Sequence, residues 1–198
     1  ASLWKKTFLY FMKKLTFKSG EKKRVLLKSP THTFRIPFLL EMFPDAQFVY
    51  IYRDPYKVYN STLHLRRTMF GDNGFAPLDM EKLEEDMSNI YVNHLDVYER
   101  DRQIVPEGQL HEVRFEDLEE DPVGELRKLY EHLNLPDFDD LVKNMQPYLK
   151  DQKSYKKNKY EMDAAQEKKI YERWQKAFEM FGYDRLPSEA LVKARVAS

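Results

Sequence analysis

KSPTHTFRIPFLLEMFPDAQFVYIYRDPYKVYNS, residues 28–61, is the stretch that decides the fold of this chain. It contains the run Phe48–Tyr52, whose apolar, β-branched and aromatic residues predict a buried strand. Arg53 follows this run directly, and helix signals resume just after it. Strands that alternate with helices form parallel sheets, and open sheets of this kind bind ligands at the carboxyl ends of their strands. The stretch therefore places a cation, Arg53, where such a sheet binds its ligand.

The residues after Arg53 are typical of a helix start. Asp54 suits the N-cap position, and Pro55 suits the first helical position because its missing N–H is not needed there. Ser61 then lies in the early turns of the helix, eight residues after Arg53. Arginine suits phosphate because its planar guanidinium stays charged and donates two parallel hydrogen bonds. Arg53 and Ser61 are candidate anion ligands, and the alternative is an ordinary Arg-Asp-Pro turn with a helical serine.

This segment resembles the sulfotransferases that use 3′-phosphoadenosine 5′-phosphosulfate (PAPS). Their motif for the 3′-phosphate of the donor is an arginine at a strand end with a serine eight positions later, as in Arg53 and Ser61. The upstream Lys-x-Pro-x-His of residues 28–32 and the Phe-Pro-Asp-Ala of residues 43–46 are similar to the broad, largely microbial branch of that family.

Two later segments extend the resemblance over most of residues 1–185. Arg-Phe-Glu-Asp-Leu at 114–118 resembles the family's Tyr-Glu-Asp strand end, and residues 174–184 resemble its C-terminal helix. The resemblance implies a helix-rich α/β fold, a P-loop-NTPase-like three-layer sandwich with a parallel sheet. It also implies transfer of a sulfuryl group from PAPS, without a metal, to a hydroxyl or amine. The acceptor would be a small molecule or a carbohydrate.

The resemblance assigns donor-binding roles to four residues. Arg53 and Ser61 would bind the 3′-phosphate, which identifies the donor but takes no part in the chemistry. Phe115 falls where relatives often carry a tyrosine near the adenine, and a phenyl ring stacks on a base but cannot hydrogen-bond to it. Lys157 belongs to the lysine-rich segment 153–160, which corresponds to a late basic loop over the nucleotide. A solvated loop is the alternative there.

Two further residues are candidates for the chemistry itself, which needs a base for the acceptor proton and a cation over developing charge. His32 is the candidate base, because imidazole titrates near neutral pH and its surroundings resemble the family's Lys-x-His segment. Lys28, at the end of a short strand predicted over residues 24–27, would hold the bridging oxygen or the departing phosphate. A structural histidine and a solvated lysine are the alternatives at these two positions.

One part of the family's pattern is missing. Its members hold the 5′-phosphosulfate in a Gly/Ser/Thr-rich loop between the first strand and a helix, where backbone N–H groups point at the anion. None of the six glycines of this chain stands in such a context. In the family this loop lies N-terminal to the Lys-x-Pro-x-His segment, and this chain begins with alanine. We therefore expect residues 1–198 to be a single domain, the C-terminal part of a longer protein. Its sheet would be incomplete on its N-terminal side, to be completed by a missing N-terminal segment or a partner chain.

Composition narrows the classes of protein and site. At 198 residues with 42% hydrophobic side chains, the chain suits one globular domain with a real core. Basic and acidic residues number 33 each, which argues against broad nucleic-acid binding because that function usually needs a basic excess. The absence of cysteine rules out disulfides, thiolate zinc sites and a cysteine nucleophile. No apolar run reaches the roughly 20 residues of a membrane helix, and we expect a cytoplasmic protein without a membrane span.

Hydrophobic periodicity predicts the other elements. Apolar residues recur at helical spacing in several segments, and turn residues separate them. Strands are predicted over residues 24–27, 47–52 and 110–115, and a loop over Gly71–Gly74. Helices are predicted over residues 2–17, 36–43, 55–69, 83–98, 122–133, 138–145 and 170–181.

Two alternatives to an active sulfotransferase remain. A non-catalytic nucleotide-binding or assembly module would keep the 3′-phosphate site and rely on another chain, or on none, for the rest. A P-loop-like kinase is the other, and the lack of a Walker lysine loop argues against it. An upstream strand and a Ser/Gly/Thr-rich loop in the source gene would favour the enzyme over the module.

Overall fold

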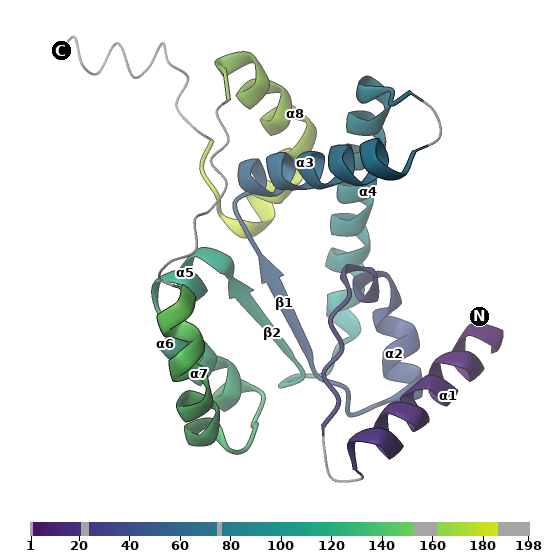
Figure 1. Ribbon diagram of the computed structural model, residues 1–198, viewed down its shortest axis with the longest axis vertical. Helices are drawn as coiled ribbons and strands as arrows, with labels where there is room; N and C mark the ends of the chain where they lie inside the picture. Colours follow the sequence, from purple (N-terminus) through teal and green to yellow (C-terminus); the bar gives the residue numbers. More distant parts are fainter. Residues whose placement is uncertain (1, 21–23, 75–76, 153–161, 186–198) are drawn as a thin grey trace.

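A parallel pair of strands lies at the centre of the chain, with helices around it (Figure 1). The computed structural model describes residues 2–20, 24–74, 77–152 and 162–185. β1 (Phe48–Tyr52) pairs with β2 (Leu110–Arg114), so that Tyr52 lies opposite Arg114. The chain crosses from β1 to β2 through α3 (Pro55–Asn73), α4 (Met80–Asp101) and the short η2 (Arg102–Ile104). The predicted helix-rich α/β architecture with a parallel sheet is confirmed.

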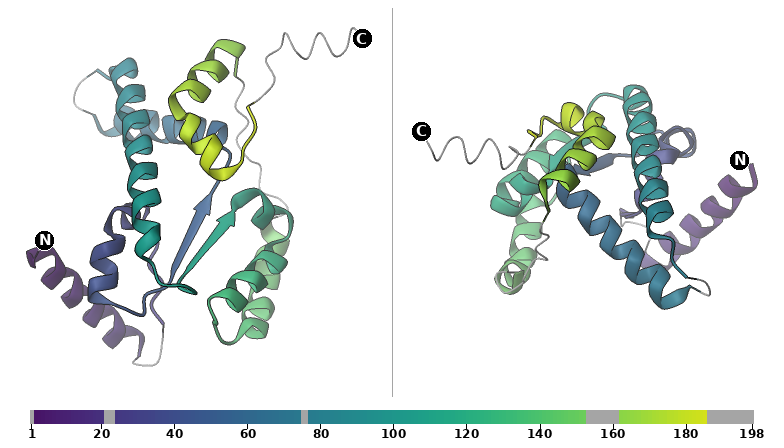
Figure 2. Two further views of the ribbon diagram at one scale, coloured as in Figure 1. Left: turned by 180° about the vertical axis from the view of Figure 1, so that it is seen from behind. Right: turned by 90° about the horizontal axis from the view of Figure 1, so that it is seen from above.

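Most of the remaining helices flank this centre on two sides, whereas α8 packs against α3 and α4. α1 and α2 lie beside the amino-terminal ends of the strands, and α5, α6 and α7 lie on the other side of the sheet (Figures 1 and 2). They comprise α1 (Ser2–Ser19), η1 (Pro30–Arg35), α2 (Ile36–Met42), α5 (Phe115–Glu120), α6 (Pro122–His132), α7 (Phe138–Gln152) and α8 (Ala164–Phe181). Among the described residues, no helix is both long and apolar enough to cross a membrane.

One face of the sheet is covered by aromatic side chains of α4 and α8. The ring of Tyr50 stacks on that of Tyr98 with a centroid distance of 3.6 Å. Tyr52 stacks on Phe181, the last residue of α8, at 4.7 Å. These contacts explain why β1 carries alternating aromatic residues, since alternate side chains of a strand point to the same face.

The opposite face is covered over β2 only. Val113 packs there with Leu129 and Leu133 from the α6 region. The β1 residues of that face, Val49 and Ile51, are 43% and 54% exposed. Parallel strands are normally buried on both faces, so this exposure marks β1 as the incompletely covered strand of the described sheet.

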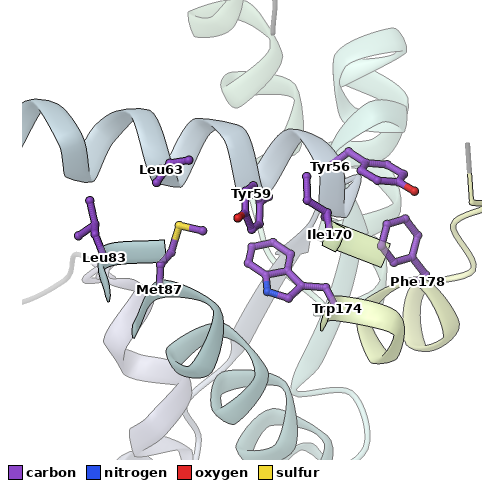
Figure 3. Close-up of a cluster of buried hydrophobic side chains, with 8 residues drawn as sticks. All are labelled: Tyr56, Tyr59, Leu63, Leu83, Met87, Ile170, Trp174 and Phe178. Atoms are coloured by element: carbon purple, nitrogen blue, oxygen red, sulfur yellow. The ribbon is translucent and has the colours of Figure 1, made fainter. Parts of the chain in front are cut away.

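α3 is held across the carboxyl ends of the strands by a core cluster that it shares with α4 and α8 (Figure 3). Trp174 of α8 lies at the centre of this cluster. Its indole stacks on the ring of Tyr91 at 3.9 Å and meets the ring of Tyr59 edge-on at 5.0 Å. Leu83 and Met87 of α4 complete the packing. This cluster fixes the direction in which α3 leaves Arg53.

Two predicted helix starts are confirmed in detail. The Asp54 carboxylate accepts a hydrogen bond from the backbone N–H of Tyr56 at 2.9 Å, and Pro55 is the first residue of α3. Asp121 caps α6 in the same way by accepting from the N–H of Gly124 at 2.9 Å. Both helices therefore begin where the Asp-Pro pairs indicate.

One predicted strand, one predicted loop and the end of one predicted helix are wrong. Residues 24–27 form no strand and Leu26 is 90% exposed, because no described strand lies beside them to satisfy their backbone groups. The predicted loop Gly71–Gly74 is mostly helical, since α3 continues to Asn73 and ends where the Gly74 N–H donates to Phe70 O at 2.8 Å. A single internal glycine costs a helix only about 1 kcal/mol. α7 also continues to Gln152, beyond the predicted end at residue 145.

Candidate functional site at the carboxyl ends of the strands

Arg53 and Phe115 meet at the carboxyl end of the sheet. Extending the register of Tyr52 and Arg114 by one residue brings Arg53 beside Phe115, the first residue of α5. The guanidinium carbon of Arg53 lies 4.3 Å from the centroid of the Phe115 ring, which is the geometry of a cation–π contact. The structure thus brings together two residues that the sequence selects from segments far apart in the chain.

The guanidinium of Arg53 keeps hydrogen-bonding capacity for an anion. Its Nε is buried and has no hydrogen-bond partner among the described residues. A buried donor without a partner costs about 1–3 kcal/mol, and an oxyanion that accepts from Nε removes this cost. The donor chemistry of Arg53 and its location at the strand ends therefore fit a phosphate group.

Glu116 contacts three segments of the chain near Arg53. Its carboxylate accepts from the backbone N–H of Asp54 at 3.3 Å and from the hydroxyl of Tyr183 at 2.6 Å. It also lies 3.7 Å from Lys57 Nζ and 3.7 Å from Arg114 Nε. Glu116 therefore links the end of β2, the start of α3 and the residues after α8, and it holds the turn that carries Arg53.

The protonation states of Glu116 and Tyr183 follow from their surroundings. Burial acts to raise the pKa of Glu116, but the hydrogen bond from Tyr183, two backbone hydrogen bonds and the charge of Lys57 outweigh it. The net pKa of Glu116 is lowered, which keeps the carboxylate ionised. Burial and the bond to Glu116 raise the pKa of the Tyr183 hydroxyl, which therefore keeps its proton and acts as a donor.

Sequence reasoning does not find the role of Glu116, because its neighbours suggest only an acidic turn. The feature that reveals this role is the register of β1 and β2. The offset of 62 residues that pairs β1 with β2 also pairs Asp54 with Glu116. That offset is known only once the two strands are paired.

Ser61 is exposed in the second turn of α3, on the helix that begins directly after Arg53 and Asp54. Its position on this helix agrees with the predicted placement. Lys157 lies outside the described residues.

The two candidates for the chemistry, His32 and Lys28, belong to the segment just before α2. His32 belongs to η1, its ring meets that of Phe8 edge-on at 6.1 Å, and its Nδ1 is buried without a hydrogen-bond partner. Lys28 is exposed in an irregular segment, not at the end of a strand as predicted. Within the described part of the chain, no hydrogen bond, ion pair or ring contact joins His32 or Lys28 to Arg53 or Phe115.

The environment of His32 favours the neutral imidazole. Burial lowers its pKa, and the positive charge of Arg35 lowers it further. A neutral imidazole is the form that accepts a proton. η1 itself is held against α4, where the ring of Phe34 meets that of His94 edge-on at 5.4 Å.

The other histidines contact protein groups. His94 Nε2 lies 3.1 Å from the hydroxyl of Tyr50, and the rings of His111 and His132 are 5.1 Å apart. No group of three or more His, Cys, Asp or Glu side chains in the described ranges is arranged to hold a metal ion.

Comparisons with known proteins place these features in a family. The model of the Sulfotransferase family matches residues 2–140. Omega-hydroxy-beta-dihydromenaquinone-9 sulfotransferase Stf3 of Mycobacterium bovis is 38% identical over 183 residues, which cover 92% of this chain and 47% of the relative. The protein of the same name from Mycobacterium tuberculosis matches with the same identity and coverage. The chain thus spans about half the length of the curated relatives that it matches.

A solved structure supports the fold. The crystal structure of sulfotransferase STF9 from Mycobacterium avium superimposes with a TM-score of 0.63 at 22% identity, covering 80% of this chain and 42% of that one. The family match, the relatives and this fold agree with each other. The chain belongs to the sulfotransferase family.

Proposed function

We propose that this chain is the donor-recognition part of a PAPS-dependent sulfotransferase that modifies a hydroxyl or amine of a small-molecule acceptor. The observation that carries the proposal is Arg53. It presents a buried Nε without a partner at the carboxyl end of the sheet, and its guanidinium lies against the ring of Phe115.

The 3′-phosphate would bind beside the start of α3. Arg53 donates from its guanidinium, and Ser61 adds a hydroxyl from the exposed second turn. Phe115 offers its ring as a stacking surface, which suits a purine without hydrogen-bonding to it. Lys157 would add positive charge over the nucleotide. The network around Glu116 keeps the Arg53 turn in place before the nucleotide arrives, which limits the cost of ordering the site on binding.

His32 and Lys28 would act at the reacting groups. PAPS supplies an activated sulfuryl group attached to a phosphate oxygen. The acceptor oxygen forms a bond to sulfur, the bond from sulfur to that phosphate oxygen breaks, and the acceptor proton passes to the imidazole of His32. Lys28 would offset the charge that develops on the departing phosphate. The lowered pKa of His32 supports this role, since it keeps the imidazole unprotonated.

The loop for the 5′-phosphosulfate would come from residues outside these 198. Only Arg53 and Asp54 separate β1 from α3, and α5 begins directly after β2. Neither connection leaves room for a loop of backbone N–H groups around an anion. The exposure of Val49 and Ile51 supports a further layer over that face of β1. The outer edge of β1, which has no partner in the described sheet, supports a strand beside it, as a complete P-loop-like three-layer sandwich requires.

The acceptor would carry its hydroxyl on a small molecule. Stf3, the 38% identical relative, is named for omega-hydroxy-beta-dihydromenaquinone-9. By extension we propose a hydroxylated small-molecule acceptor for the complete protein that contains this chain.

The second candidate is a binding or assembly module that keeps the 3′-phosphate site but performs no transfer. The short connections after β1 and β2, which hold no loop for the 5′-phosphosulfate in the described structure, favour it. Transfer of label from radioactive PAPS to a hydroxylated acceptor distinguishes the two functions in a version of the chain extended through the upstream strand and loop. The proposal predicts transfer that His32→Ala reduces and nucleotide binding that it preserves. Binding without transfer in the extended wild type would favour the module.

A further inference from the structure

The outer side of α1 carries a stripe of exposed apolar side chains. Leu3, Tyr10 and Phe17 are 77%, 61% and 90% exposed. They are spaced by seven residues, and seven residues return to nearly the same side of a helix, with a drift of about 20°. Together they form a line along almost the whole of α1, which we name the outer stripe (Leu3, Tyr10 and Phe17).

The other side of α1 makes the contacts that hold the helix on the protein. The rings of Trp4 and Phe8 stack on each other at 4.9 Å. Trp4 packs against Phe38 of α2, and Phe8 against Phe43. The outer stripe is therefore not needed for the docking of α1 onto the described part of the chain.

Lysines border the outer stripe on both sides. Lys6 and Lys13 lie three residues after one stripe residue and four before the next, which places them along one border. Lys14 and Lys18 follow the other border, and Lys14 Nζ lies 4.5 Å from the centroid of the Tyr10 ring. All four are exposed.

The charge of α1 has one sign. Residues 2–19 contain five lysines and no acidic residue, whereas the whole chain is formally neutral. The fifth, Lys5, is on the inner side and forms an ion pair with Glu41. The outward charge of α1 is therefore wholly positive.

An apolar stripe with aromatic side chains, bordered by lysines, matches a helix that lies in the interface of a bilayer. The apolar side chains enter the region between headgroups and acyl chains, and each lysine is attracted electrostatically to a negatively charged lipid surface. A second copy of α1 would bring positive borders against positive borders, so the charge disfavours a homodimer through this stripe.

We propose that α1 docks on the surface of an anionic phospholipid bilayer, with the outer stripe in the headgroup region and Lys6, Lys13, Lys14 and Lys18 against lipid phosphates. α1 lies at the periphery of the fold, away from the carboxyl ends of the strands (Figures 1 and 2). The docked helix lies along the surface and leaves the Arg53 corner open to solvent. The proposal does not rest on the proposed function, since α1 supplies none of the residues named there.

Vesicle flotation of the 198-residue chain tests this proposal. Vesicles of phosphatidylglycerol and phosphatidylcholine are compared with vesicles of phosphatidylcholine alone. We expect the chain to float with the mixed vesicles and to remain in solution with the neutral ones. Exchanging the four bordering lysines for glutamine should reduce partitioning onto mixed vesicles by on the order of a hundredfold or more, since each lysine contributes near an anionic surface.

A second pair of variants separates the outer stripe from apolar exposure in general. Leu3→Ser, Tyr10→Ser and Phe17→Ser together should reduce partitioning by at least about tenfold through the lost apolar burial. The matched control is Leu65→Ser, Ile104→Ser and Tyr148→Ser, at sites 56%, 54% and 59% exposed on other elements, and it should bind as wild type does. Circular dichroism checks that each variant keeps its helix content.

These measurements distinguish bilayer docking from the absence of docking and from a dimer. Partitioning that requires anionic lipid, the stripe and the lysines supports bilayer docking. Wild-type chain that stays in solution with both kinds of vesicle, or equal losses in stripe and control variants, overturns it. A dimer in analytical ultracentrifugation that the stripe variant dissolves, without vesicle binding, would assign the outer stripe to a second copy instead.

Discussion

Replacing Arg53 by methionine tests how the donor is recognised. Methionine keeps an unbranched apolar side chain that can lie on the ring of Phe115, but it removes the charge and every donor. In the proposed site the guanidinium makes two hydrogen bonds to a charged phosphate, each with a net value of about 1.5–3 kcal/mol. The variant should lose at least about 3 kcal/mol of affinity for 3′-phosphoadenosine 5′-phosphate, which is a factor of about 150.

The same substitution has an unusual expected effect on stability. Wild-type Arg53 keeps a buried Nε without a partner, which costs about 1–3 kcal/mol. Its cation–π contact with Phe115 returns about 0.5–2 kcal/mol. Arg53→Met in the absence of nucleotide should therefore unfold in urea with a free energy equal to or above that of wild type. Loss of binding then cannot be attributed to loss of fold.

Isothermal titration calorimetry measures the binding, with adenosine 5′-phosphate as the reference nucleotide. Wild type should prefer the 3′-phosphorylated nucleotide, and Arg53→Met should bind both nucleotides equally weakly. Arg53→Lys keeps the charge but loses the planar pair of N–H donors. Its affinity for 3′-phosphoadenosine 5′-phosphate should therefore fall between those of wild type and Arg53→Met. Arg67→Met, at an exposed arginine of α3, is the matched control and should bind as wild type does. Undiminished affinity in Arg53→Met would refute the assignment.

Three further predictions concern the network, the core and the base. Glu116→Gln should lower the free energy of unfolding by about 1.5–3 kcal/mol at neutral pH, as expected for hydrogen bonds to a charged group. Because the folded pKa of Glu116 is lowered, this contribution is present above the unfolded pKa and is lost as the pH falls through the folded pKa. Urea titrations should therefore give a gap between wild type and variant that closes in acid, and a constant gap would contradict the prediction. Trp174→Ala should cost about 3–5 kcal/mol, since it removes the centre of the core cluster; chemical denaturation that shows a loss below about 1 kcal/mol would contradict this packing. In an active, extended version of the chain, the acidic limb of turnover should have an apparent pKa below 6.5, and Arg35→Gln should raise it, because the Arg35 charge lowers the pKa of His32. An unchanged limb in that variant would remove His32 as the titrating base.

The sequence predicts the parts of the site that depend on neighbouring residues. The strand over Phe48–Tyr52, the Asp54 cap and the Pro55 start are local signals, and together they place Arg53 at the end of β1. The strand predicted over residues 110–115 places Phe115 at a strand end, whereas β2 ends at Arg114 and Phe115 begins α5. The structure then adds the distance between the two side chains, which depends on the pairing of the strands.

Most of the errors arise where residues far apart in the sequence decide the structure, and one arises from the propagation of a helix. Residues 24–27 have the composition of a strand, but a strand exists only beside another, and none of the described strands lies next to them. α3 continues through Gly71 because the helix is already nucleated and adds one hydrogen bond for each further residue. The role of Glu116 follows from the register of two strands that are 62 residues apart, which local patterns do not contain.

A crystal structure of the 198-residue chain with 3′-phosphoadenosine 5′-phosphate would show whether Arg53 binds the 3′-phosphate. We expect the 3′-phosphate at the carboxyl end of β1, with an oxygen about 2.7–2.9 Å from Arg53 Nε and the hydroxyl of Ser61 turned toward the same group. A nucleotide bound elsewhere on the chain, or one whose 3′-phosphate faces solvent while Arg53 remains on Phe115 without a partner, would contradict it.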